Sequence, residues 1–166
     1  MAELIVVTGA VGSGKTTTAK LLAKLLRWDY LDLNSLLLKY PALVTGFDKK
    51  RDSKIVDVKK MNTLLKKVFA ASKRSIVFDS HLSHYLSPSL VDLCVVTTCS
   101  LPVLKKRLQK RKYAAGKVRE NLDAAIFDVC LVEALESGHE LVLVDTEQEV
   151  KKQCQEILQL YFPKRR

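Results

Sequence analysis

Residues 9–16, Gly-Ala-Val-Gly-Ser-Gly-Lys-Thr, have the composition and spacing of a phosphate-binding loop. Glycines allow successive backbone N–H groups to turn toward phosphate oxygens, and a helix that starts at such a loop adds the positive end of its dipole. Lys15 is expected to bind the outer phosphates, and the Thr16 hydroxyl to coordinate Mg²⁺. The alternative interpretation is a glycine-rich turn without a ligand.

A second candidate group follows the hydrophobic segment Ile-Val-Phe at 76–78, where Asp79 and His81 are separated by one serine. In an open α/β sheet the carboxyl end of a strand faces the ligand crevice, so Asp79 is expected to hold Mg²⁺ directly or through water. His81 could orient the attacking group or assist proton transfer. A helix cap or surface turn is the alternative for Asp79, and His84 is expected to be structural.

The third candidate group is basic. Arg107 and Arg111 are four residues apart, so on a helix they share one face and could clamp transferred phosphates. The small residues 114–116 that follow could form a flexible lid. The alternative is that these basic residues form only a solvated helix face.

Five short apolar, β-branched segments are predicted strands that would position these groups, and the one at 28–33 is weaker than the others. They cover residues 4–8, 28–33, 75–79, 93–98 and 141–144. Between them, apolar residues recur with helical spacing over 16–27, 57–72, 103–112 and 119–137. Strands that alternate with helices predict an α/β fold, with a parallel sheet covered on both faces.

Local signals place several helix ends. Ser100 and Pro102 are typical of a helix start, and Gly138 is placed to stop the helix over 119–137. Thr146 and Glu149 have capping-box spacing for a last helix that ends near residue 161.

Composition limits the classes of protein that remain. The chain has 166 residues, 48% hydrophobic and 28% charged, which fits a single domain over 1–166. No apolar run approaches the roughly 18 residues of a membrane-spanning helix, and no signal peptide is recognised, so a cytoplasmic protein is expected. The cysteines at 94, 99, 130 and 154 lack paired spacing and are expected to be buried thiols. A net charge of +10 predicts attraction to polyanions.

Residues 9–17, 79–81, 107–113 and 120–122 together resemble the adenylate kinase isoenzyme six-like family, of the prokaryotic or archaeal type. These are small nucleotide kinases and ATPases that also act in small ribosomal subunit maturation. The similarity runs from Leu4 to about Leu143. Its distinctive parts are the Asp-any-His form at 79–81, Thr-Gly-Phe-Asp at 45–48, and a short lid that ends before the Glu-Asn pair at 120–121.

The resemblance implies a three-layer nucleoside monophosphate kinase fold with a five-stranded parallel sheet. Residues 33–56 would be the monophosphate-binding segment and residues 110–120 the lid. Asp79 and His81 match the family's catalytic motif. The resemblance implies that Arg111 is a lid arginine near ATP. It also implies that the ATP phosphates bind to these residues: Gly12, Gly14, Lys15, Thr16 and Thr17.

The expected activity is transfer of the γ-phosphoryl group of MgATP to AMP, with associated ATPase activity. Lys15, Asp79, His81 and Arg107 would serve catalysis, and Thr16 with Asp79 would bind Mg²⁺. The resemblance also implies a role in small-subunit rRNA (18S or 16S) maturation. The expected partners are the small-subunit ribosomal protein that is eleventh in the universal numbering, together with pre-rRNA. The alternatives are an ATP-hydrolysing assembly factor with little kinase activity and a kinase for another small acceptor, such as shikimate or dephospho-coenzyme A.

The sequence departs from the family pattern near both predicted nucleotide segments. Lys39 stands where some members have arginine, and lysine lacks the planar two-point contact that arginine makes with phosphate. Lys112 replaces a frequent glycine at the lid hinge, and Ser80 and Leu82 flank His81 where an aromatic residue and a glycine are common.

Overall fold

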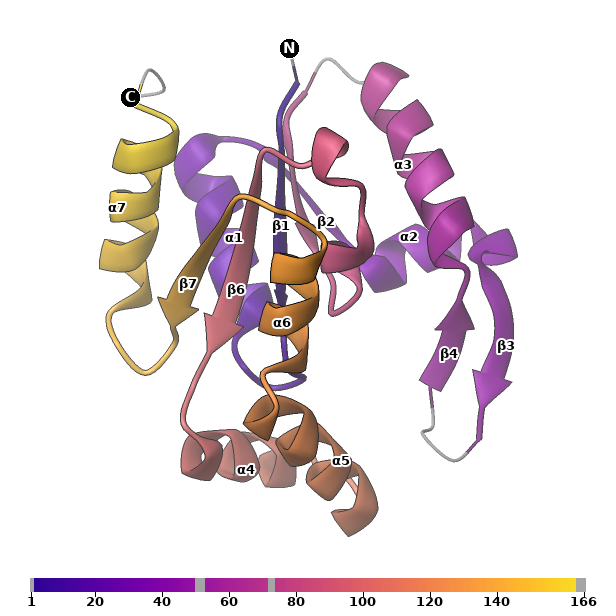
Figure 1. Cartoon of the computed structure of the whole chain (residues 1–166), viewed down its shortest axis with the longest axis vertical. Helices are drawn as coiled ribbons and strands as arrows, with labels where there is room; N and C mark the ends of the chain where they lie inside the picture. Colours follow the sequence, from indigo (N-terminus) through magenta and orange to yellow (C-terminus); the bar gives the residue numbers. More distant parts are fainter. Residues whose placement is uncertain (1, 50–52, 72–73, 164–166) are drawn as a thin grey trace.

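The computed structural model describes residues 2–49, 53–71 and 74–163, and its centre is a five-stranded parallel sheet (Figure 1). The strands lie in the order β2-β5-β1-β6-β7. The three central strands β5, β1 and β6 consist largely of buried apolar residues, as a sheet covered on both faces requires, whereas the edge strand β2 has an aspartate at each end and is half-buried. The predicted fold class and all five predicted strands are confirmed, with these bounds: β1 Leu4–Gly9, β2 Asp29–Asp32, β5 Ile76–Asp79, β6 Leu93–Thr98 and β7 Leu141–Asp145.

Helices cover both faces of the sheet. Helices α1 (Lys15–Leu26) and α7 (Val150–Tyr161) pack on one face, while α2 (Leu33–Lys39), α3 (Val58–Ala71) and α6 (Val129–Glu136) pack on the other. Side chains of β1 alternate between the two layers, because successive strand residues point to opposite faces. Leu4 and Val6 therefore belong to the core beneath α3 and α6, and Ile5 and Val7 to the core beneath α1.

Two helices lie beyond the carboxyl ends of the strands. Helices α4 (Leu101–Lys110) and α5 (Ala115–Ile126) pack against each other around a small core of Leu104, Leu108 and Val118 (Figure 1). Short 3₁₀ turns connect other elements, at Pro41–Leu43, Ser83–Tyr85 and Pro88–Leu90.

The prediction of one long helix over 119–137 is wrong. The chain forms α5 and α6 instead, separated by Phe127 and Asp128, and Asp128 has a left-handed φ of 47°. The apolar spacing continues across this break because α5 packs on α4 and α6 packs on the sheet. Gly138 follows the end of α6 with φ +79°, so the predicted stop is confirmed.

The predicted capping box at Thr146 is also wrong. Helix α7 begins at Val150, its N-cap residue is Glu149, and no side chain caps it. The Thr146 hydroxyl donates to the Ser13 carbonyl oxygen, so a tertiary contact replaces the local cap. Ser100 is the N-cap residue of α4 as expected, but its backbone N–H and hydroxyl donate to Glu147 rather than capping the helix.

Residues 33–56 contain an antiparallel hairpin that the sequence did not predict. Strands β3 (Val44–Asp48) and β4 (Ser53–Val56) form a separate two-stranded sheet and stand beside α2 and α3 (Figure 1). The structure also differs from the flexible lid predicted at 114–116, because Ala115 and Gly116 form the first turn of α5. Helix α4 ends at Lys110, short of the predicted 112, and Lys112 has a left-handed φ of 59°.

The cysteines are only partly as expected. Cys94 and Cys154 are buried, whereas Cys99 and Cys130 are half-buried, and all four are free thiols. Among the described residues no helix has the length and apolar character needed to cross a membrane. The predicted end of the second helical segment, at residue 72, lies outside the described residues.

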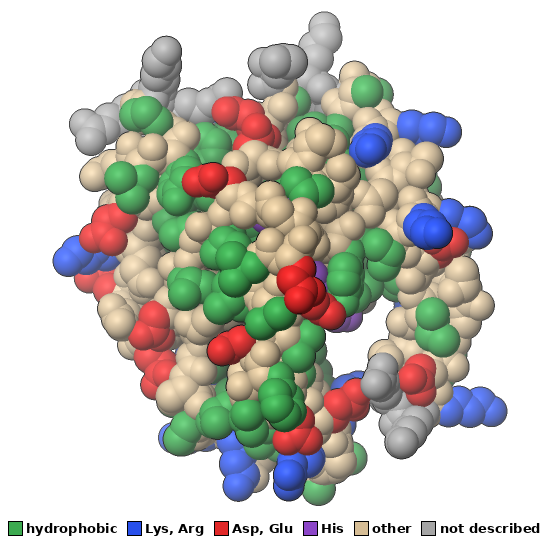
Figure 2. Space-filling view, in the orientation of Figure 1, with side chains coloured by type: hydrophobic (Ala, Val, Ile, Leu, Met, Phe, Trp, Pro, Cys, Tyr) green, Lys and Arg blue, Asp and Glu red, His purple; other side chains and the backbone are tan. Residues whose placement is uncertain are grey.

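Apolar side chains remain on the surface over α6 and β7 and over the lower end of the molecule near α5 (Figure 2). They include Phe127, Leu135 and Leu143, which are 73%, 57% and 50% exposed. Helix α6 therefore covers the centre of the sheet and leaves part of the edge strand β7 open.

Candidate active site

The carboxyl ends of β1, β2 and β5 meet at one edge of the sheet and form the floor of an open cleft. Parallel pairing sets Asp79 beside Val7 on one side and beside Asp32 on the other. Eight of the nine predicted site residues line this cleft, and only Arg107 does not: Gly12, Gly14, Lys15, Thr16, Thr17, Asp79, His81 and Arg111. Residues far apart in sequence are thus brought together as a parallel sheet predicts.

The glycine-rich loop runs from the end of β1 to the first residue of α1. Gly9, Gly12 and Gly14 have φ of +137°, +90° and +103°. Helix α1 starts at Lys15, so its N-terminus faces the cleft, and its unpaired N–H groups favour an anion there. The Lys15 ammonium donates to the carbonyl oxygens of Gly9 at 3.0 Å and Ala10 at 2.9 Å. Burial lowers the pKa of Lys15 to about 8, so the side chain is still mostly protonated at neutral pH.

Thr16, Asp79 and Tyr30 form one hydrogen-bonded group. The Thr16 hydroxyl donates to Asp79 Oδ2 at 2.6 Å, and the Tyr30 hydroxyl donates to the same oxygen at 2.9 Å. Mg²⁺ prefers hard oxygen ligands and commonly takes one or two side chains together with substrate phosphates and water. The Thr16 and Asp79 oxygens fit that chemistry, and the described residues contain no larger cluster of histidine, cysteine and acidic ligands.

Tyr30 is a site residue that the sequence reasoning missed. It lies on β2, and its hydroxyl holds the Asp79 carboxylate in place. Burial, followed by the hydrogen bond to Asp79, raises the pKa of Tyr30 well above its usual value, so the hydroxyl remains a donor. The sequence contained a sign of this contact, because the predicted strand at 28–33, which includes Tyr30, would end at the same sheet edge as Asp79.

The two histidines that follow β5 differ. His81 lies in the cleft and is exposed at its outer edge, yet surrounding protein and then the nearby Lys15 cation lower its pKa to about 4. It is therefore neutral at pH 7 and can accept a hydrogen bond. His84 is buried, with Nδ1 2.7 Å from Thr8 Oγ1 and Nε2 2.9 Å from Glu133 Oε2. His84 is structural, as expected.

The two predicted arginines have different surroundings. Arg111 lines the cleft, whereas the Arg107 guanidinium donates to Thr146 Oγ1 at 2.8 Å, to the Thr146 carbonyl oxygen at 3.2 Å and to the Gly12 carbonyl oxygen at 3.4 Å. The expected pair of arginines over the cleft is therefore divided. Arg107 holds the glycine-rich loop, and its contact with a transferred phosphate stays a prediction.

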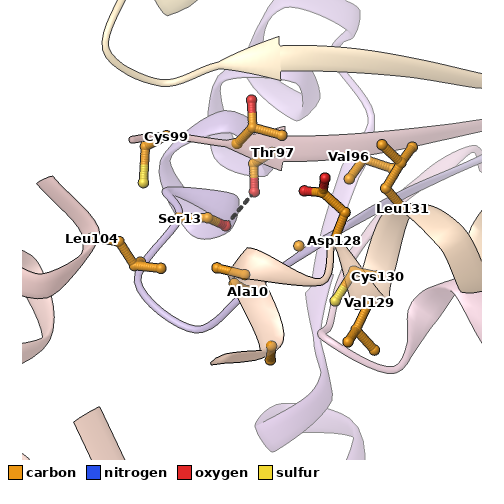
Figure 3. Close-up of a pocket in the computed structure, with 14 residues that line it drawn as sticks. Ala10, Ser13, Val96, Thr97, Cys99, Leu104, Asp128, Val129, Cys130 and Leu131 are labelled. Carbon is orange, nitrogen blue, oxygen red and sulfur yellow. Dashed lines mark hydrogen bonds between the residues drawn. The ribbon is translucent and has the colours of Figure 1, made fainter. Parts of the chain in front are cut away.

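The loop is held from behind as well. Ser13 Oγ lies 2.6 Å from Thr97 Oγ1, next to a small cavity lined by Ala10, Leu104 and Cys130 (Figure 3). Thr146 adds the bond from its hydroxyl to the Ser13 carbonyl oxygen at 2.7 Å. The loop conformation is thus fixed by β6 and by the segment after β7.

We expect Thr146→Val to lower the free energy of unfolding by about 1–3 kcal/mol, because it takes the hydroxyl donor from the Ser13 carbonyl oxygen and removes one of the three acceptors of the Arg107 guanidinium. Urea denaturation followed by circular dichroism measures the change. Thr146→Ser keeps the hydroxyl and should stay close to wild type. Equal midpoints for the valine variant and wild type would show that this contact contributes nothing.

Comparison of the sequence with known proteins identifies a matching family and relatives. A family model described as "AAA domain" matches residues 5–128. A protein from Methanosarcina acetivorans named "Putative adenylate kinase" is 38% identical over 138 residues, which cover 80% of this chain and 72% of the relative. A protein of the same name from Methanocaldococcus jannaschii is 36% identical over 137 residues, with coverage of 82% and 75%.

Solved structures share the fold. Shikimate kinase from Acinetobacter baumannii in complex with shikimate has a TM-score of 0.68 at 18% identity, covering 99% of this chain and 95% of that one. Deoxyadenosine kinase from M. mycoides has a TM-score of 0.60 at 17% identity, covering 95% and 97%. At these identities the likeness shows a common P-loop kinase fold and nothing about the acceptor.

Proposed function

The chain belongs to the family described by the AAA domain model, and from this premise we propose that it is a nucleotide kinase that transfers the γ-phosphoryl group of MgATP to AMP. The observation that carries the proposal is the convergence of Lys15, Thr16, Asp79 and His81 on one cleft. The names of the archaeal relatives support the choice of an adenylate kinase.

Each cleft residue has a role in the proposed reaction. Phosphoryl transfer needs little covalent help from a protein, so positioning and charge neutralisation supply most of the catalysis. The loop N–H groups and Lys15 would hold the ATP phosphates, and Arg111 would neutralise charge from the lid side. Thr16 and Asp79 would hold Mg²⁺, which would supply positive charge to neutralise the phosphates. Neutral His81 would orient the attacking phosphate oxygen of AMP.

The segment proposed to bind the monophosphate begins at the cleft. Asp32, Leu33 and Asn34 line it at the end of β2 and the start of α2, and the chain then continues into the β3–β4 hairpin. This arrangement supports residues 33–56 as the acceptor side and residues 110–120, which include Arg111, as the ATP side.

ATP hydrolysis is the second candidate function, and the position of His81 in the open cleft, where water can reach it, favours it. A neutral imidazole in the cleft can accept a hydrogen bond from a water molecule and orient it in place of AMP, but a pKa of about 4 makes it a weak acceptor of the proton itself. Hydrolysis could then drive a role in small-subunit maturation, with the eleventh ribosomal protein of the universal numbering and pre-rRNA as proposed partners. The family resemblance supports this role.

An assay of wild type and His81→Ala with MgATP, with and without AMP, tests the proposal. ADP and free phosphate are measured separately. We expect AMP to raise the rate of ADP formation by wild type, with little release of free phosphate. In His81→Ala we expect this AMP-dependent rate to fall by about 10²-fold, because the acceptor is no longer oriented. His81 is exposed, so its replacement should leave stability almost unchanged.

Phosphate release that is independent of AMP would instead identify an ATPase. CMP, UMP and shikimate serve as alternative acceptors in the same assay. A faster rate with any of these than with AMP would overturn the proposed acceptor while leaving ATP binding intact.

A further inference from the structure

The charges of this basic chain are unevenly distributed. Residues 120–149 contain nine of the 18 acidic residues and no lysine or arginine, although the chain as a whole has a net charge of +10. These residues form most of α5, all of α6 and β7, and the start of the loop before α7. One region of a cationic protein is therefore anionic.

Exposed apolar side chains lie in the same region. We call it the α6–β7 face and define it by these residues: Phe127, Asp128, Val132, Leu135, Glu136, Glu140 and Leu143. The outer side of α6 carries Val132, Leu135 and Glu136, which are exposed and share one helix face, and the exposed N-cap residue Asp128 also lines the small cavity beside the glycine-rich loop (Figure 3). Acidic and apolar groups thus alternate along one helix face.

The edge strand β7 continues this face. Leu141 packs against the same core as Ala134 of α6, and Leu143 lies two residues further on and so on the same side of the sheet. Leu143 is 50% exposed. Figure 2 shows apolar and acidic side chains across the middle of this view, whereas lysine and arginine lie toward its margins.

The carboxylates of the face are available to a partner. Among the ion pairs between described residues, none involves Asp128, Glu136 or Glu140. Apolar side chains surrounded by such carboxylates are typical of a surface that gains affinity from apolar contact and selects its partner by charge.

We propose that the α6–β7 face binds a basic polypeptide segment whose apolar side chains contact Val132, Leu135 and Leu143. The carboxylates oppose nucleic acid and anionic lipid, because both carry negative charge. Binding of pre-rRNA would then belong to another part of the surface. This proposal rests on the protein-partner part of the proposed function and not on phosphoryl transfer, since none of these residues lines the cleft.

The test uses the full chain and a fluorescein-labelled 20-residue peptide that alternates lysine and leucine. The test variant is Leu135→Ser with Glu136→Lys on α6. The matched control is Leu160→Ser with Glu156→Lys on α7, where both side chains are also exposed. Fluorescence anisotropy measures binding, and ADP formation from MgATP and AMP is measured on the same samples.

We expect the α6 variant to bind the peptide at least tenfold more weakly than wild type and the α7 control to bind like wild type. A peptide with serine in place of leucine should also bind at least tenfold more weakly. Equal binding by both variants would mean diffuse charge attraction and would overturn the proposal, as would no binding by wild type.

Two further outcomes identify a different occupant. If sedimentation shows that wild type is a dimer and the α6 variant a monomer, a second copy covers the face. If the α6 variant binds a 20-nucleotide RNA more weakly than wild type does, the face binds RNA. Either result overturns the proposal without bearing on the reaction, which the ADP assay reports. Titration with the ribosomal protein tests that partner separately.

Discussion

Lys15→Met is expected to reduce ADP formation from MgATP and AMP by about 10³-fold, because it removes the cation that would bridge the outer phosphates. The ammonium donates to the Gly9 and Ala10 carbonyls at the start of the loop, so it lies where the phosphates are proposed to bind. Methionine has a similar length and no charge. Its burial should cost less than that of a cation, so stability should be kept or raised.

Initial rates measure the expected loss of turnover. The lost cation should also weaken binding of MgATP, which calorimetric titration measures. Lys24→Met is the matched control, because Lys24 lies exposed on the same helix and does not line the cleft. We expect it to behave as wild type. A Lys15→Met rate within tenfold of wild type would show that phosphoryl transfer takes place without this side chain and would remove the main support for the proposed site.

Gly9→Ala is expected to have the largest effect on stability, lowering the free energy of unfolding by about 3 kcal/mol or more. Gly9 has φ +137°, a conformation that a side chain disfavours. A Cβ added there would lie 2.5 Å from the Thr97 carbonyl oxygen and 2.6 Å from its hydroxyl, and a backbone atom in the centre of the sheet cannot move aside.

Gly116→Ala is the control for this change. Gly116 lies in α5, and a Cβ there would meet nothing within 4 Å, so we expect alanine to stabilise the protein by about 0.5–1 kcal/mol. Thermal and urea unfolding of both variants measure the difference. Similar midpoints for Gly9→Ala and wild type would mean that the loop can adopt another conformation, and the tight packing of Gly9 against β6 would then not be required.

The sheet and the cleft were predictable because their signals are local. Apolar β-branched segments indicate strands wherever they lie, and the spacing of Gly9, Gly14 and Lys15 defines the loop within eight residues. The carboxylate at the end of β5 follows from the polarity of a parallel sheet. These signals depend on neighbouring residues, and tertiary packing did not override them.

Other features depend on contacts that local spacing does not encode. Thr146 and Glu149 satisfy the capping-box pattern, yet the Thr146 hydroxyl donates to Ser13, which lies 133 residues earlier. The apolar spacing of α5 continues into α6 although the chain turns at Asp128. The β3–β4 hairpin forms a two-stranded sheet of its own, and three of the four β4 residues are exposed, so it lacks the buried apolar segment that marks the central strands.

The bond between Thr146 and Ser13 also has a consequence for synthesis of the chain. The glycine-rich loop is made within the first 16 residues, but its supports at Thr97 and Thr146 emerge from the ribosome much later. Contacts of such long sequence separation form slowly and late. A nascent chain that ends before β7 would therefore carry the loop sequence without its fixed conformation. We expect such a chain to bind ATP more weakly than the complete protein does.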